Sequence, residues 1–181
     1  MDPFDHRDHR DRLDALEGMD HRILSALRAR GADPRVGGAA RALSRAGEHG
    51  ALWIAAGLAG AAVDGARRGA WLRGTVLTAG AHVVSMGVKR VVRRPRPAHV
   101  VPLVTTVGRH SFPSSHATSA TAAAVAFGVL GARAVPPLAA AMCLSRLVVG
   151  VHHPSDVAAG AVLGALTACV GARWVRGGAC D

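Results

Sequence analysis

The chain has 181 residues, which suit one domain, and a formal net charge of +10; half of its residues are apolar, yet only 3% are aromatic. The scarcity of large aromatic side chains argues against an ordinary soluble core, because such side chains dominate core burial. Small residues instead let helices pack closely in lipid. The positive charge comes with no recognisable nucleic-acid-binding module and no interleaved stacking aromatics, which excludes nucleic acid as a partner.

The first 30 residues divide into two parts. Residues 1–12 are rich in Asp, His and Arg and are expected to be disordered, because they hold few apolar side chains. Residues 13–30 are expected to form an amphipathic helix that lies at a membrane interface. Apolar residues recur there at helical spacing, namely Leu13, Leu16, Ile23, Leu24 and Leu27.

Apolar stretches then follow one another, joined by short polar segments. They cover about residues 50–63, 74–88, 117–132, 134–151 and 157–172. None alone reaches the ~20 apolar residues of a clear membrane span, so each taken singly could be a buried soluble helix. Their succession, with no period-two alternation, favours an all-α integral membrane bundle of about five spans. The whole chain is expected to be one domain with a helical core over 48–172.

Three short segments carry the chemistry. They are Lys89–Pro97 (KRVVRRPRP), Pro113–His116 (PSSH) and Ser145–Asp156 (SRLVVGVHHPSD). If the spans alternate in direction, all three lie at the same membrane face. There they would combine cations for phosphoryl oxygens with the amides of a helix start, which bind phosphate. The sequence therefore predicts an enzyme that acts on phosphate.

The residues of these segments suggest individual roles. Lys89, Arg96 and Arg146 are candidate phosphate ligands, together with helix-start groups at Ser114 and Ser115. His116 could protonate a leaving oxygen. His152 and Asp156 are four positions apart, so the carboxylate could hold one imidazole nitrogen and free the other as a nucleophile or base. His153 lacks this spacing and is assigned to packing or to the interface.

The pattern Lys89-x6-Arg96-Pro97, Pro113-Ser114-Ser115-His116, Ser145-Arg146-x5-His152-x3-Asp156 resembles the type 2 phosphatidic acid phosphatase family. The resemblance implies an all-helical membrane fold and a two-step reaction with no metal or other cofactor. In that reaction His152 forms a phosphohistidine and Asp156 orients it, while His116 protonates the departing alcohol and then activates water. The second motif commonly has Gly where this chain has Ser115, and membrane members usually have six spans rather than five.

A finer resemblance is to the decaprenylphosphoryl-5-phosphoribose phosphatases of actinobacterial cell-wall arabinan synthesis. It rests on the small size, on Gly47-Glu48-His49 and on the segments KRVVRRPRP, SFPSSHATS and GVHHPSDV. This resemblance implies loss of the 5-phosphate from a prenyl-linked ribose, with membrane lipids around the protein. Further residues could contact the substrate headgroup, the arginines being equally compatible with lipid headgroup contacts. They are Arg93, Arg94, Arg109 and Glu48.

Other interpretations remain open at this stage. The same site could serve a polyprenyl diphosphate or phosphatidylglycerol-phosphate phosphatase, a vanadium-dependent haloperoxidase, or a bundle that only binds anionic lipid. Lys and Arg are more numerous on the predicted site face than on the other, 15 against six, which indicates a site facing the cytoplasm from the cell membrane. Gly57/Gly60 and Gly160/Gly164 would suit close helix contacts within a subunit or in a homo-oligomer.

Overall fold

The computed structural model describes residues 3–106 and 108–175, and within them every regular element is a helix apart from one β-bridge between Pro95 and His110. The all-α prediction is therefore confirmed. The helices are α1 (Pro3–Arg30), α2 (Pro34–Ala46), α3 (Ala51–Val63), α4 (Arg68–Val92), α5 (Ser115–Gly128), α6 (Val135–Val148) and α7 (Pro154–Val175), with 3-10 turns η1 (Glu48–Gly50) and η2 (Gly65–Arg67).

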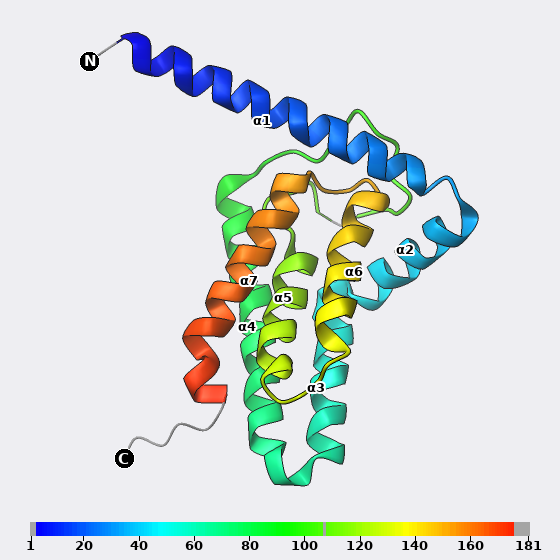
Figure 1. Ribbon diagram of the computed structural model, residues 1–181, viewed down its shortest axis with the longest axis vertical. Helices are drawn as coiled ribbons and strands as arrows, with labels where there is room; N and C mark the ends of the chain where they lie inside the picture. Colours follow the sequence, from blue (N-terminus) through cyan, green and yellow to red (C-terminus); the bar gives the residue numbers. More distant parts are fainter. Residues whose placement is uncertain (1–2, 107, 176–181) are drawn as a thin grey trace.

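The helices form a bundle with a lid-like helix at one end (Figure 1). Helices α3 to α7 run along the long axis, and α5 is central, because it packs against α4, α6 and α7 and also contacts α3. Helix α1 lies across the end of the bundle where α7 begins and α6 ends, and α2 descends obliquely beside α6. The connection from α4 to α5, residues 93–114, crosses this same end of the bundle.

Small side chains let the helices approach closely around a few large ones. Trp53, Trp71 and Phe127 lie in the main core cluster, and the rings of the last two are 5.3 Å apart. A β-carbon at Gly160 or Gly164 of α7 would collide with the backbone of α5. The space that a β-carbon would need at Gly57 and Gly60 is likewise occupied by side chains of α4 and α5. These glycines therefore pack within the subunit and give no support to a contact between subunits.

The five apolar stretches correspond to α3–α7, although α4 and α7 extend beyond the predicted ranges. Among the described residues, α7 is the one helix that is long and apolar enough to cross a membrane by length and composition. Helix α2 lies in a segment to which the sequence analysis assigned no element. It begins with Asp33, whose side chain accepts hydrogen bonds from the amides of Arg35 and Val36, and with Pro34 in its first turn.

The N-terminal helix differs from the prediction. It begins at Pro3 instead of near residue 13, so residues 3–12, expected to be disordered, continue the helix; residues 1 and 2 lie outside the described part. The segment from Pro3 to Arg12 holds no glycine, and its one proline stands at the first helical position, where proline is tolerated.

Candidate active site

The end of α4 sets the position of the first motif. Lys89 lies in the last turn of α4, and the helix ends at Arg93, which adopts a left-handed conformation with φ of 52°. Pro95 and Pro97 follow and prevent the helix from continuing. The loop then folds back on itself, because Ser111 donates its amide to the Arg94 carbonyl and its hydroxyl to the Pro95 carbonyl. This hairpin leads directly into the start of α5.

A cavity of about 140 Å³ lies at this end of the bundle and gathers most of the predicted site residues. Its walls come from α2, η1, α4, the 93–114 loop, α5, α6 and the turn before α7. The predicted residues that line it are Glu48, Lys89, Arg96, Ser115, His116, Arg146 and His152, and the others are Ser44, His49, His82, Met86, Thr105, Thr106 and Gly108.

Three cations reach the cavity from different elements: Lys89 from α4, Arg96 from the 93–114 loop and Arg146 from α6. Arg96 donates to the carbonyl of Val151 at 2.7 Å and to that of Gly108 at 2.8 Å, which fixes its guanidinium plane. Burial lowers the pKa of Arg96, although the Asp156 carboxylate raises it. Arg146 is 3% exposed, and its Nε has no hydrogen-bond partner in the described structure. A buried guanidinium with an unused donor is costly, so an anion in the cavity would satisfy it.

Ser44 of α2 supports two site residues and was missed by the sequence analysis. Its hydroxyl accepts a hydrogen bond from Arg146 Nη1 at 2.5 Å, and its carbonyl oxygen lies 3.0 Å from His116 Nε2. Because a carbonyl can only accept, this contact places a hydrogen on Nε2 of His116. A serine in an unassigned helix, far from any motif, gives no sequence signal for such a role.

The two histidines before α7 are arranged differently from the prediction. Asp156 Oδ2 accepts a hydrogen bond from the backbone amide of His153 at 2.8 Å and lies 3.2 Å from His153 Nδ1. Nδ1 of His152 is 3.7 Å from the same oxygen, beyond hydrogen-bond range, and this buried nitrogen has no hydrogen-bond partner among the described residues. His153 therefore contacts Asp156 more closely than His152 does, although His152 is the one that lines the cavity.

The charge state of His152 follows from its surroundings. Burial lowers the pKa of His152 well below its ordinary value, and Arg146, Arg96 and Lys89 act in the same direction, while Asp156 opposes them. The imidazole is thus held neutral, the form in which a ring nitrogen has a free electron pair for attack.

The start of α5 supplies fewer free amides than the sequence predicted. The Ser114 amide donates to the Asp156 carbonyl at 2.9 Å, and the Ser114 hydroxyl accepts from the Ala117 amide as the helix cap. Ser115 and His116 are the first two residues of the helix, so their amides have no intrahelical acceptor. The amides that remain available for an anion at this helix start are therefore those of Ser115 and His116 and not that of Ser114.

The headgroup candidates separate into three environments. Glu48 lines the cavity, whereas Arg93 and Arg109 are exposed on the surface, with Arg93 Nε donating to the Arg90 carbonyl. The position of Arg94 differs most clearly from the prediction that it contacts a substrate headgroup. Its guanidinium forms ion pairs with Asp20 of α1 at 3.0 Å and with Asp156 at 2.9 Å, so its charge is already balanced by protein carboxylates.

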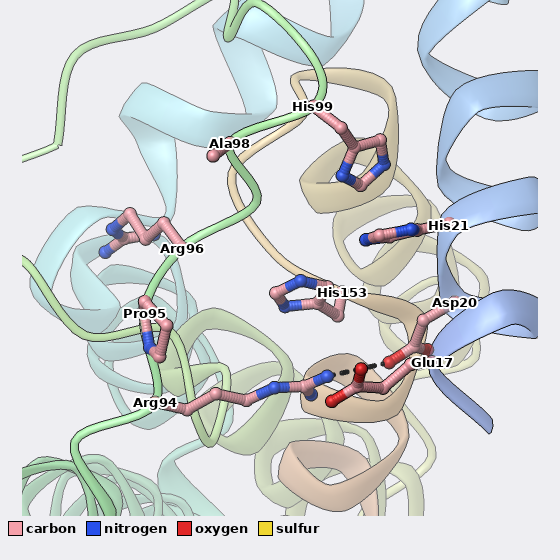
Figure 2. A pocket seen from close by; sticks show the side chains of 9 residues that line it. All are labelled: Glu17, Asp20, His21, Arg94, Pro95, Arg96, Ala98, His99 and His153. Atoms are coloured by element: carbon pink, nitrogen blue, oxygen red, sulfur yellow. Dashed lines mark hydrogen bonds and ion pairs between the residues drawn. The ribbon is translucent and has the colours of Figure 1, made fainter. Parts of the chain in front are cut away.

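A second cavity, of about 330 Å³, lies between α1 and the 93–114 loop. Figure 2 shows Glu17, Asp20 and His21 on the α1 side, facing Arg94 and His99 of the loop, whereas the Arg96 side chain points away from α1. The rings of His21 and His99 are 4.0 Å apart. Arg96 lines both cavities, so the two cavities adjoin each other at this side chain.

Residues 70–178 match the PAP2 superfamily, and the chain belongs to this family, as its motifs indicated. The chain is 46% identical to decaprenylphosphoryl-5-phosphoribose phosphatase of Mycolicibacterium smegmatis, over 79% of this chain and 81% of that protein. It is 43% identical to the Mycobacterium tuberculosis protein of the same name, over 72% and 76% of the two chains. The fold is similar to the transmembrane PAP2-type phosphatidylglycerolphosphate phosphatase of Bacillus subtilis, with a TM-score of 0.70, 21% identity and coverage of 90% and 85%.

Proposed function

We propose that this phosphatase removes the 5-phosphate from decaprenylphosphoryl-5-phosphoribose and leaves decaprenylphosphoryl-ribose. The observation that carries the choice of substrate is the identity of 43–46% to two phosphatases named for it, over 72–79% of the chain. The site supports the chemistry, because three cations and four imidazoles, among them those of His116 and His152, line one cavity. The phosphatidylglycerolphosphate phosphatase of Bacillus subtilis supports only the fold, at 21% identity.

The reaction follows from the side chains around the cavity. His152 attacks phosphorus through its free electron pair, an N–P bond forms, and the P–O bond to ribose breaks. His116, in its protonated form, gives a proton to the departing ribose oxygen. Water then attacks phosphorus, the N–P bond breaks and its electron pair returns to His152, His116 takes the water proton, and phosphate leaves. Lys89, Arg96 and Arg146, with the amides of Ser115 and His116, balance the charge of the phosphoryl oxygens in both steps.

Asp156 takes part in this reaction by a small rearrangement. Once His152 carries a phosphoryl group, its Nδ1 must hold a hydrogen and a positive charge. Nδ1 needs to move about 0.8 Å closer to Asp156 Oδ2 to form a hydrogen bond of ~2.9 Å. The imidazolium would then be stabilised by the buried carboxylate, as a charge-assisted hydrogen bond.

The outer surface of the bundle suits a lipid environment. Large apolar side chains point outward along several helices, including Val76, Val83, Leu144, Val162 and Leu166. A soluble monomer rarely exposes so many large apolar side chains. Helices α3–α7 are the five segments that we assign to the membrane. Helix α1 exposes Leu16, Met19 and Ile23, which suits a helix lying at the membrane interface across the site end.

The distribution of Lys and Arg between the two ends of the bundle also bears on which side of the membrane the site faces. The end of the bundle that holds the cavity also carries α1, α2 and the basic 93–114 loop, whereas Arg67, Arg68 and Arg73 mark the opposite end near the α3–α4 turn. The excess of Lys and Arg at the site end supports our proposal that the site faces the cytoplasm.

The test is phosphate release by detergent-purified protein in EDTA, with decaprenylphosphoryl-5-phosphoribose and a polyprenyl diphosphate compared side by side. We expect release from the first substrate and none from the His152→Ala variant. Preference for the diphosphate would replace the substrate but keep the mechanism. Release that requires added metal, or that persists in His152→Ala, would refute the mechanism.

A further inference from the structure

One buried carboxylate of α1 has no place in the chemistry described so far. Asp20 is 4% exposed, although its neighbours Leu16, Met19 and Ile23 face outward. A carboxylate removed from water is costly unless it is paired and hydrogen-bonded. Asp20 must therefore be compensated by specific partners, and all of these come from segments more than 70 residues away in the sequence.

The partners of Asp20 belong to the active-site end of the bundle. Its Oδ1 accepts the backbone amide of Ser155 at 2.9 Å, and its Oδ2 accepts Arg94 Nη2 at 3.0 Å as well as the Ser155 hydroxyl. Figure 2 shows the Arg94 guanidinium extending from the loop to the Asp20 carboxylate of α1. Ser155 is the second residue of α7, so Asp20 caps this helix from another part of the chain.

Arg94 extends the contact to the residue that supports the nucleophile. Its Nη1 donates to Asp156 Oδ1 at 2.9 Å and to the Ser155 hydroxyl at 2.6 Å. One planar guanidinium thus joins two carboxylates, a geometry that Lys could not reproduce. The hydrogen bonds from Arg94 to Asp20 and Asp156 raise the pKa of Arg94 despite its burial, so the cation persists.

This arrangement has an electrostatic consequence for Asp156. If Arg94 faced Asp156 alone, its full positive charge would be balanced by that carboxylate, and less of the negative charge would remain to stabilise an imidazolium at His152. Asp20 supplies a second negative charge to Arg94 and relieves Asp156 of this demand. It also fixes the first turn of α7, on which Asp156 is held relative to His152 and His153.

We propose that Asp20 is a positioning residue of the active site: through Arg94 and Ser155 it fixes Asp156 and preserves its charge for His152. Helix α1 therefore completes the site in addition to covering it. The proposal rests on the proposed function, in which His152 is the nucleophile. Asp20 does not line the smaller cavity, so it acts on the rate of the chemical step and not on phosphate binding.

The test uses the full chain in detergent with the lipid phosphate substrate. Asp20→Asn keeps the size of the side chain and removes its charge, and Asp14→Asn is the matched control, because Asp14 is an exposed carboxylate of the same helix. We expect kcat to fall about tenfold in Asp20→Asn with KM within about twofold of wild type, and no change in Asp14→Asn. An unchanged kcat in Asp20→Asn, or a loss confined to KM, would overturn the proposal.

A double-mutant cycle separates positioning from a general loss of stability. Asp20→Asn should cost less further kcat in an Arg94→Gln background than it costs in wild type, because the path through Arg94 is already cut and only the path through Ser155 remains. Additive losses would overturn the proposal. If Asp20→Asn does not fold, Ser155→Ala replaces it, because this variant keeps the charges of Asp20 and Arg94 and removes only the hydroxyl between them. We expect a several-fold fall in kcat, and an unchanged kcat would overturn the proposal.

His152→Ala, assayed in parallel, distinguishes the two proposals. Activity that persists in His152→Ala would refute the nucleophile and thus the proposed function. An inactive His152→Ala beside a fully active Asp20→Asn would leave the proposed function standing and refute only the role of Asp20.

Discussion

Gly160 of α7 allows a close approach between α7, which begins within the third motif, and α5, which begins within the second. A β-carbon there would lie 2.5 Å from the Ser114 carbonyl oxygen and 3.2 Å from the Ser114 amide nitrogen. In a Gly160→Ala variant α7 would have to move roughly 1 Å away from α5 to restore a normal contact of ~3.5 Å. Asp156, one helical turn earlier on α7, would move with it.

The cost can be estimated from the contacts. Overpacking of this kind costs about 1–3 kcal/mol, and weakening the bond from the Ser114 amide to the Asp156 carbonyl adds about 0.5–1.5 kcal/mol. Replacing a mid-helix glycine by alanine returns about 0.5–1 kcal/mol. The net loss is about 0.5–4 kcal/mol, which lowers Tm by roughly 1–16 °C for a chain of this length. A shift of about 1 Å at the reacting groups would also lower kcat about 100-fold.

Gly80→Ala is the matched control, because Gly80 lies inside α4 and a β-carbon there would meet nothing within 4 Å. It should raise Tm by about 1–4 °C and leave activity unchanged. The assay is a thermal melt in detergent together with single-turnover phosphate release. A Gly160→Ala protein as stable and active as Gly80→Ala would refute this account of the α5–α7 contact.

Three further predictions concern residues in or beside the smaller cavity. His153→Asn should lower kcat less than about tenfold, because it removes one hydrogen bond to Asp156 and no reacting atom; a loss in steady-state phosphate release as complete as that of His152→Ala would contradict this. Arg96→Lys should raise the inhibition constant for inorganic phosphate about tenfold, since lysine cannot keep both carbonyl contacts and a planar fork toward the anion, and an unchanged constant would be the opposite result. Because the pKa of His152 in the folded state lies below that of the unfolded chain, the unfolded chain takes up the proton first; the contribution of His152 to stability is full above about pH 6.5 and declines as pH falls below it. Comparing wild type with His152→Ala in melts between pH 5 and 8 measures this difference, and a wild-type advantage that grew toward acid would contradict it.

The sequence predicts the meeting of the three motifs well, and the reason is topological. Lys89 ends one helix, Ser115 and His116 begin the next, and Arg146 ends the one after, so alternating helices bring them to the same end of the bundle. The type of each side chain then indicates phosphate chemistry, because cations and imidazoles close together have few other uses.

The sequence predicts the second layer of contacts poorly. The four-residue spacing of His152 and Asp156 suggested one helical turn, but α7 begins only at Pro154, so the spacing rule does not apply and His153 makes the closer contact. Asp20 and Ser44 act from α1 and α2 through contacts 135 and 102 residues away in the sequence. No local pattern marks such residues, since their partners are set by how whole helices dock.

The most direct test of the account is to trap the phosphorylated enzyme by rapid quenching under alkaline conditions and to locate the phosphoryl group by mass spectrometry of the peptide that spans both histidines. We predict an acid-labile phosphoryl group on His152, absent from His152→Ala and retained in His153→Asn. A phosphoryl group on His153, or turnover of the lipid phosphate with no phosphorylated histidine at any time, would contradict it.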